Sequence, residues 1–198
     1  MMKYDCLLVG VGGQGVLSVA AVIAHSAAKI NYSVRQSEVH GMAQRGGAVL
    51  AHLRLAGPGE TIAGDLVPKG AADIIISMEP LESLRYLAWL SPGGMVVSSA
   101  DSLINIPNYP EKEELEKAVK SLPKSAYIPA GELAREAGLA RTVNIVMVGA
   151  ASPFLPIPED VLENTIVGMF TAKGRELAEF NKKAFQLGRS LSLDNIRQ

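Results

Sequence analysis

The chain has 198 residues, of which 48% are hydrophobic and 20% charged; this composition excludes disordered and polar linker proteins and suffices for one domain with a sizeable core. Nineteen basic and 20 acidic residues leave a net charge of −1, so no overall positive field favours nucleic acid as a partner. The single cysteine, Cys6, excludes an internal disulfide framework, a zinc ribbon and a four-cysteine iron–sulfur cluster built from this chain alone. Asp5 and the glycines after it interrupt the apolar N-terminal segment, which predicts neither a signal peptide nor a membrane span and therefore a cytoplasmic protein.

The first half of the sequence alternates strand and helix patterns. An apolar run at 4–9 predicts a buried strand, and the alanine-rich, proline-free stretch 16–29 predicts the helix that follows it. Alternation of apolar and polar side chains predicts a further strand at 48–55. The other elements expected here are strands at 33–37, 74–78 and 95–99 and a helix at 81–90 that Ser91-Pro92-Gly93-Gly94 ends.

The second half is typical of helices. Asn108 and Glu111 have the spacing of a capping box, and the helix expected after them carries Glu–Lys pairs that indicate a solvated face. The remaining expected elements are a last strand at 126–129, a buried helix at 143–151, a helix beginning near Pro158 and an amphipathic helix at 175–187 that Gly188 ends.

Strands that alternate with helices predict a single α/β domain over residues 1–198. We expect a Rossmann-like fold, with a mostly parallel sheet flanked by helices and a helical C-terminal segment. Within it, 1–130 is expected to form the α/β core and 131–198 a mainly helical extension that covers the sheet or reaches a partner.

A glycine-rich turn joins the first strand to the first helix. Gly10, Gly12 and Gly15 satisfy the G-x-G-x-x-G pattern, with Gly13 and Gln14 inside it. Glycines permit positive φ and the close approach of a phosphate, and the free amides of the following helix attract anions. All five residues are therefore candidate ligand-binding residues. The alternative is a tight packing turn that binds nothing.

A nicotinamide cofactor requires one more feature. Dinucleotide-binding enzymes usually place an acidic residue about 20 residues beyond the turn, at the end of the second strand, to bind the ribose hydroxyls. Residues 35–38 occupy this position: Arg35 suits a 2′-phosphate, and Glu38 lies slightly late. No acid or base suited to hydride transfer follows, so redox use of a nicotinamide is disfavoured.

The segment 37–47 concentrates polar groups in one connection. Arg45 can bind a carboxylate or phosphate with two parallel N–H groups, and the glycines after it let backbone amides turn toward the same anion. If the first two strands are adjacent and parallel, this segment and the glycine turn share the carboxyl edge of the sheet, where α/β folds bind ligands. A structured loop held by an Arg45–Glu38 ion pair is the alternative. The candidate binding residues here are Ser37, Glu38, Arg45, Gly46 and Gly47.

Other polar residues favour structure over chemistry. Cys6 falls inside a predicted buried strand, and the three histidines lack metal-ligand spacing, so no metal site is expected. Glu79-Pro80 follows a strand and belongs either to a site or to the start of a helix. Asn144 either donates to a neighbouring loop or caps a turn. The sequence contains no recognisable catalytic constellation.

The chain resembles the gamma-type subunits of 2-oxoacid:ferredoxin oxidoreductases in two motifs, Gly10-x-Gly-Gly-Gln-Gly15 and Ser37-Glu38-x-x-Gly-Met-Ala-Gln-Arg-Gly-Gly47. The second motif is most similar to the form found in the indolepyruvate branch of the family. Segments 73–80 and 181–188 fit the family's next strand and its C-terminal helices. The similarity therefore covers nearly the whole chain.

This resemblance implies an accessory subunit of a complex that decarboxylates 2-oxoacids oxidatively, transfers the acyl group to coenzyme A and passes electrons to ferredoxin. The resemblance places thiamine diphosphate, magnesium and 4Fe–4S clusters on a larger partner, the alpha subunit, because this chain has one cysteine and no thiamine-binding signature. The chain alone would hold no cofactor and would be inactive.

Two other function classes remain open. One is a free-standing NAD(P)-binding oxidoreductase, which cofactor uptake by the isolated chain would reveal. The other is a ligand-sensing α/β module without catalysis, which would not co-purify with a large iron–sulfur partner. We expect neither a nucleic acid nor a membrane as a partner in any of the three.

Overall fold

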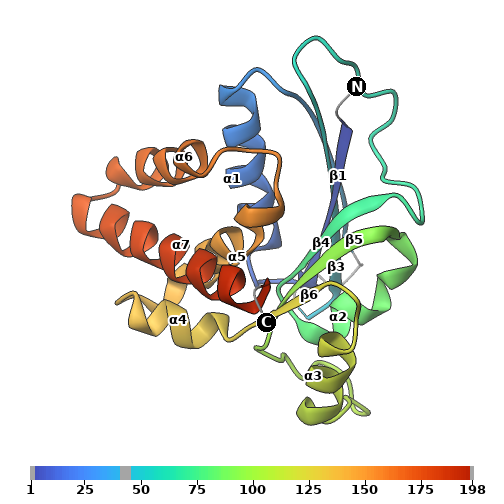
Figure 1. Ribbon diagram of the computed structural model, residues 1–198. Coiled ribbons are helices and arrows are strands. Elements are labelled where there is room, and N and C mark those ends of the chain that lie inside the picture. Colours follow the sequence, from blue (N-terminus) through green and yellow to red (C-terminus); the bar gives the residue numbers. More distant parts are fainter. Residues whose placement is uncertain (1–2, 41–45, 197–198) are drawn as a thin grey trace.

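The computed structural model describes residues 3–40 and 46–196 and contains one six-stranded sheet (Figure 1). Its strands are β1 (Lys3–Val11), β2 (Ser33–His40), β3 (Ala48–Ala56), β4 (Ala72–Ser77), β5 (Leu90–Ser99) and β6 (Ser125–Ile128). They lie in the order β2-β3-β1-β4-β5-β6, and β3 runs opposite to the other five. The expected mostly parallel sheet is thus confirmed.

The first two strands are parallel but not adjacent, which corrects the expectation of adjacency. The chain leaves β2, turns back through β3, and β3 pairs with both β2 and β1 in antiparallel register. Val49 of β3 lies opposite Gly10 on one side and His40 on the other. The carboxyl ends of β1 and β2 therefore still reach the same edge of the sheet, one strand apart.

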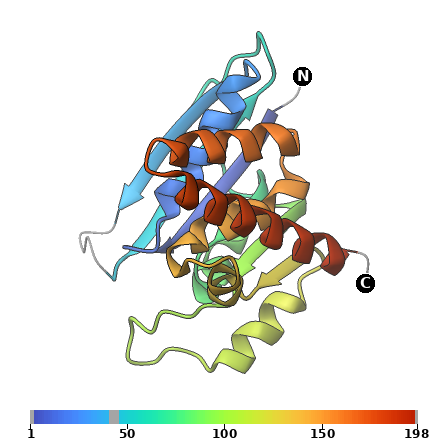
Figure 2. The ribbon, with the colours of Figure 1, turned by 90° about the vertical axis from the view of Figure 1, so that its left-hand side faces the viewer.

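Helices cover the two faces of the sheet unequally (Figures 1 and 2). One face carries α1 (Val16–Lys29), α4 (Ala130–Glu136), α5 (Val143–Ala151), α6 (Glu159–Thr171) and α7 (Arg175–Ile196), with the short turns η2 (Ala140–Thr142) and η3 (Ser152–Phe154). The other face carries α2 (Pro80–Arg85), η1 (Leu87–Trp89) and α3 (Lys112–Lys120). The helical second half is thus packed mainly on one face.

The central strands are apolar throughout because both of their faces are buried. Side chains alternate between the faces of a strand, so Leu8 and Ile76 pack toward α1 and α5, while Leu7 and Ile75 pack under Trp89. A strand covered on both sides has no polar face, which explains the continuous apolar runs from which these strands were predicted.

Two predicted boundaries were wrong. The segment 81–90 forms the six-residue α2 and the turn η1, and β5 begins at Leu90, so Ser91–Gly94 lies within a strand rather than after a helix. A Cβ at Gly94 would lie 2.8 Å from the Ala72 carbonyl oxygen, which shows how closely the two strands approach there.

The predicted capping box is also absent: Glu111 precedes α3 without a side-chain cap, and α3 starts at Lys112.

Gly188 does not end a helix. α7 continues through it to Ile196, because Gly188 sits where α7 presses against α5. A Cβ at Gly188 would lie 2.1 Å from the Val146 carbonyl oxygen, and one at Gly149 would lie 2.0 Å from the Phe185 carbonyl oxygen. The two glycines therefore allow backbone contact between the helices, a tertiary requirement that a local helix-end rule does not detect.

Replacing Gly188 with alanine should lower the free energy of unfolding by about 1–3 kcal/mol, because the added methyl group forces α5 and α7 apart. Gly168→Ala in α6 is the matched control, since a Cβ there meets nothing within 4 Å. It should be neutral or stabilising by up to about 1 kcal/mol. Urea unfolding of the two variants measures both effects, and equal stability would disprove the close helix contact.

Candidate functional site

The glycine-rich turn occupies the expected place between β1 and α1. Gly13 has φ +101° and Gly15 has φ +82°, conformations that L side chains rarely adopt. Gly10 is needed for space: a Cβ there would lie 2.9 Å from Val16 Cγ2 and 3.0 Å from Met78 Cβ. The motif thus serves both backbone conformation and close packing.

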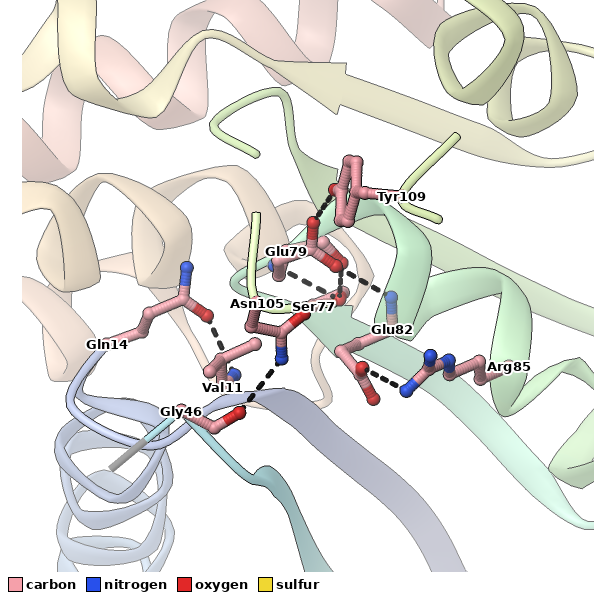
Figure 3. A network of polar contacts seen from close by, with 9 residues as sticks. All are labelled: Val11, Gln14, Gly46, Ser77, Glu79, Glu82, Arg85, Asn105 and Tyr109. Atoms are coloured by element: carbon pink, nitrogen blue, oxygen red, sulfur yellow. Dashed lines mark hydrogen bonds and ion pairs between the residues drawn. The ribbon is translucent and has the colours of Figure 1, made fainter. Parts of the chain in front are cut away.

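Gln14 joins the ends of two neighbouring parallel strands. Its Oε1 accepts a hydrogen bond of 2.8 Å from the Val11 amide (Figure 3), and its Nε2 donates to the Met78 carbonyl oxygen at 3.2 Å. Both polar groups of the side chain are therefore bonded within the chain. This gives Gln14 a structural role in the turn, and its assignment as a ligand-binding residue stays a prediction.

The start of α1 is suited to an anion. Gly15 is its N-cap without a side-chain bond, and the first turn contains no acidic residue. The positive end of the helix dipole is therefore not neutralised locally. A cavity of about 350 Å³ opens here, lined by the turn glycines Gly12, Gly13 and Gly15 with Leu17 and Val49.

Asn144 lies under this turn. Its Oδ1 accepts from the Ile145 amide at the start of α5, and its Nδ2 is 3.6 Å from the position a Gly15 Cβ would take. Asn144 is the second residue of α5, whose N-cap is Thr142 without a side-chain cap bond, so neither of the two roles weighed for it is established. No hydrogen bond from it to a neighbouring loop is seen within the described residues.

The second glycine-rich segment meets the first. The Gly12 amide donates to the Gly47 carbonyl oxygen at 2.8 Å, and Gly46 has φ +77°. The two motifs therefore share one edge of the sheet, as expected, although β3 lies between their strands. Arg45, and with it the alternative Arg45–Glu38 ion pair, lies outside the described residues.

Ser37 and Glu38 do not converge on the turn. β2 runs to His40, three residues past the predicted strand end at Ser37, so Glu38 also belongs to the strand and not to a loop. They point to opposite faces, since Ser37 pairs with His52 and Glu38 with Ala51. The exposed Glu38 accepts from Gln36 at 2.9 Å. Their role in binding stays a prediction.

A polar network that sequence reasoning missed borders the same edge (Figure 3). Glu79 is 1% exposed and caps α2 by accepting from the Glu82 amide at 2.9 Å, while its other oxygen accepts from the Tyr109 hydroxyl. Asn105 Nδ2 donates to the Gly46 carbonyl oxygen at 2.9 Å. Glu79-Pro80 is thus a helix start, one of its two predicted roles. Asn105 and Tyr109 lie in the long segment before α3, whose lack of helix or strand periodicity was the only sequence feature that pointed to them.

The ionisable groups of this network hold structure together. Burial raises the pKa of the Glu82 carboxyl, and the Arg85 guanidinium at 2.9 Å partly offsets that effect. Burial, followed by the hydrogen bond to Glu79, raises the pKa of the Tyr109 phenol, which stays protonated as a donor. The second carboxylate oxygen of Glu82 is buried without a hydrogen-bond partner among the described residues.

The described residues offer no cluster of side chains that could hold a metal ion or an iron–sulfur cluster. Cys6 is fully buried in β1, and burial raises the pKa of its thiol, so it is neither a nucleophile nor a cluster ligand. His52 Nδ1 accepts from the Val67 amide at 3.1 Å. Residues 3–40 and 46–196 contain no group of three or more His, Cys, Asp or Glu side chains that could hold a metal ion. They also contain no helix long and apolar enough to cross a membrane.

Comparison with known proteins assigns this arrangement to a family. The family of pyruvate ferredoxin/flavodoxin oxidoreductases matches residues 5–191. The chain belongs to this family. Among its members, indolepyruvate oxidoreductase subunit IorB of Thermococcus kodakarensis is 37% identical over 198 residues, 95% of each chain, and the IorB subunit of Archaeoglobus fulgidus is 31% identical over 94% of each. The resemblance seen in the two glycine motifs is confirmed.

Solved structures of the family share the fold. The gamma subunit of a keto/oxoacid ferredoxin oxidoreductase from Geobacter sulfurreducens matches with a TM-score of 0.70 at 21% identity, over 96% of this chain and 99% of that one. A 2-oxoglutarate:ferredoxin oxidoreductase from Magnetococcus marinus, solved with 2-oxoglutarate, coenzyme A and succinyl-CoA, matches with a TM-score of 0.75 at 20% identity. The match covers 98% of this chain but only 32% of the longer Magnetococcus chain.

Replacing Gln14 with alanine should lower the free energy of unfolding by about 1–3 kcal/mol, because the Val11 amide and the Met78 carbonyl lose their side-chain partner. Gln36→Ala is the matched control, since this exposed glutamine bonds only Glu38 among its described side-chain partners. It should change stability by less than about 0.5 kcal/mol. Urea unfolding of the two variants measures both changes in the free energy of unfolding. Equal changes would show that Gln14 does not join the two strands.

Proposed function

We propose that the chain is the accessory subunit of an indolepyruvate ferredoxin oxidoreductase. The complex would oxidise aryl 2-oxoacids with loss of carbon dioxide, form the acyl-CoA thioester and pass the electrons to ferredoxin. The observation that carries the proposal is the 37% identity to an indolepyruvate oxidoreductase subunit over almost the full length of both chains.

The chemistry of this reaction assigns the cofactors to a larger subunit. Decarboxylation requires thiamine diphosphate with magnesium, and electron transfer requires 4Fe–4S clusters. The described residues do not fit these groups, because Cys6 is buried and no metal-binding cluster is present among them. This chain would therefore bind the larger alpha subunit and shape access to its site, and it would be inactive alone. A cytoplasmic location fits a soluble electron acceptor.

The glycine turn is the proposed anion site for coenzyme A. Its diphosphate requires N–H donors and a positive potential, and the uncapped start of α1 supplies both beside a cavity of about 350 Å³. Gly46 and Gly47 lie across the same opening, since the Gly47 carbonyl bonds the Gly12 amide. A carboxylate of the partner subunit is the other anion that this edge could bind.

The strand order disfavours the nicotinamide alternative. In dinucleotide-binding folds the second strand lies directly beside the first, so the residue at its end reaches the ribose. Here β3 separates them, which places the end of β2 about 10 Å from β1 instead of about 5 Å. Glu38 also points to the face opposite Ser37 and bonds Gln36.

Co-expression with the alpha subunit tests the proposal. The pair should co-purify and reduce ferredoxin when given indolepyruvate and coenzyme A. The isolated chain should contain no iron or thiamine diphosphate and should reduce no NAD(P). Stoichiometric iron in the isolated chain, or reduction of NAD(P) by it, would contradict the proposal.

If Arg45 makes a buried contact with the anion, Arg45→Ala should lower the turnover or the apparent coenzyme A affinity of the complex about ten- to a hundredfold, since a charge-assisted bond of that kind contributes roughly 1.5–3 kcal/mol. The motivation is its position in sequence directly before Gly46 and Gly47. Arg45→Lys should recover only part, because a point charge cannot bind an anion with two parallel N–H groups. Wild-type kinetics with a large fall in melting temperature would instead identify Arg45 as a structural residue.

A further inference from the structure

Residues 100–111 form a long connection between β5 and α3, here called the strap. It contains twelve residues without helix or strand, whereas connections in compact domains usually have about 4–6. Figure 2 shows it as a yellow-green segment that runs out from the sheet before it enters α3. Long ordered connections of this kind usually have a function of their own.

Two side-chain bonds hold the strap across the carboxyl edge of the sheet (Figure 3). Asn105 bonds the Gly46 carbonyl oxygen before β3, and Tyr109 bonds Glu79 at the start of α2. From the end of β5 to the start of β3 the strap crosses three strand spacings, about 14 Å. The strap is therefore fixed beside the second glycine segment, whose Gly47 bonds Gly12 of the glycine turn.

The strap carries large apolar side chains that are exposed to solvent. Ile104 is 76% exposed and Leu103 36%, and Val39, near the end of β2 at the same edge, is 52% exposed. Among the described residues only one other large hydrophobic side chain, Leu66, is comparably exposed, at 56%. Three of the four exposed large hydrophobic side chains among the described residues thus lie at the edge that carries the candidate site. Such gathering marks an interaction surface.

We infer that the strap is the docking element of this chain and that Ile104 and Leu103 insert into an apolar pocket of the larger subunit. The inference rests on the proposed function, which supplies that subunit. The only charged residues of the strap, Asp101 and Glu111, stand at its two ends, so its middle matches an uncharged, apolar surface and not a phosphate or a nucleic acid. The matched fold also occurs as 32% of a longer chain in the Magnetococcus structure, continuous with further protein.

Position supports the larger subunit over other occupants. The reacting groups of the proposed enzyme lie outside this chain, so its ligand edge must face the subunit that holds them. The strap lies on this edge, and its bond to Gly46 connects it with the segment that contacts the glycine turn. The two anchors also hold Ile104 in place before association, which lowers the entropy cost of binding.

Ile104→Asp tests the inference through the binding of this chain to the larger subunit. The affinity of the chain for the larger subunit, measured by titration calorimetry, should fall at least tenfold, because a charge replaces an apolar side chain that the inference buries in the interface. Leu66→Asp is the matched control: Leu66 is also well exposed, at 56%, but it lies near Arg54 and Asp5, about 20 Å along β1 from the glycine turn. Its affinity should stay within about twofold of wild type.

The outcomes separate this inference from the proposed function. Wild type that binds the larger subunit together with Ile104→Asp that binds equally well, at an unchanged melting temperature, overturns the docking role of the strap alone. Wild type that binds no such subunit overturns the proposed function, and the inference with it. If Ile104→Asp converts a dimer of this chain into a monomer and leaves the affinity for the larger subunit intact, the strap binds a second copy and the inference is wrong.

Discussion

The close approach of β1, β4 and α1 at Gly10 is the constraint on which the site depends. A side chain there would overlap Val16 and Met78, so only glycine lets the helix begin directly over the end of β4. Gln14 then bonds Val11 and the Met78 carbonyl across this junction. The chain switches faces here, because α1 covers one face of the sheet and α2 the other. Such switch points are where α/β folds form ligand crevices.

The insertion of β3 changes what this crevice can bind. It keeps β1 and β2 parallel and brings their carboxyl ends to one edge, but it holds the second strand one position too far away to bind the ribose of a dinucleotide. At this edge the Gly12 amide bonds the Gly47 carbonyl oxygen, and Asn105 bonds the Gly46 carbonyl oxygen. The proposed anion site therefore lacks the ribose-binding position of a dinucleotide-binding fold.

The proposed role as an accessory subunit accounts for several features of the structure. The described residues hold no metal cluster, Cys6 is sealed in the core, and the buried Glu79 and Glu82 bond backbone, Tyr109 and Arg85 rather than an open cavity. Ile104 meanwhile faces solvent although its burial would be favourable. The low fraction of charged residues, 20%, fits a surface that is partly covered in an assembly.

The sequence by itself determined the α/β class, most element positions, the glycine turn and the family, because periodicity and glycine spacing are local properties that the residues carry with them. The tertiary structure alone decided the place of β3 between β1 and β2, the continuation of α7 through Gly188 and the extension of β2 past Ser37 to His40. It also decided that Gln14 bonds two strands and that Asn105 and Tyr109 hold the strap across the site. Each of these depends on contacts between residues distant in the chain, and no local pattern encodes which distant backbone will lie within hydrogen-bonding distance.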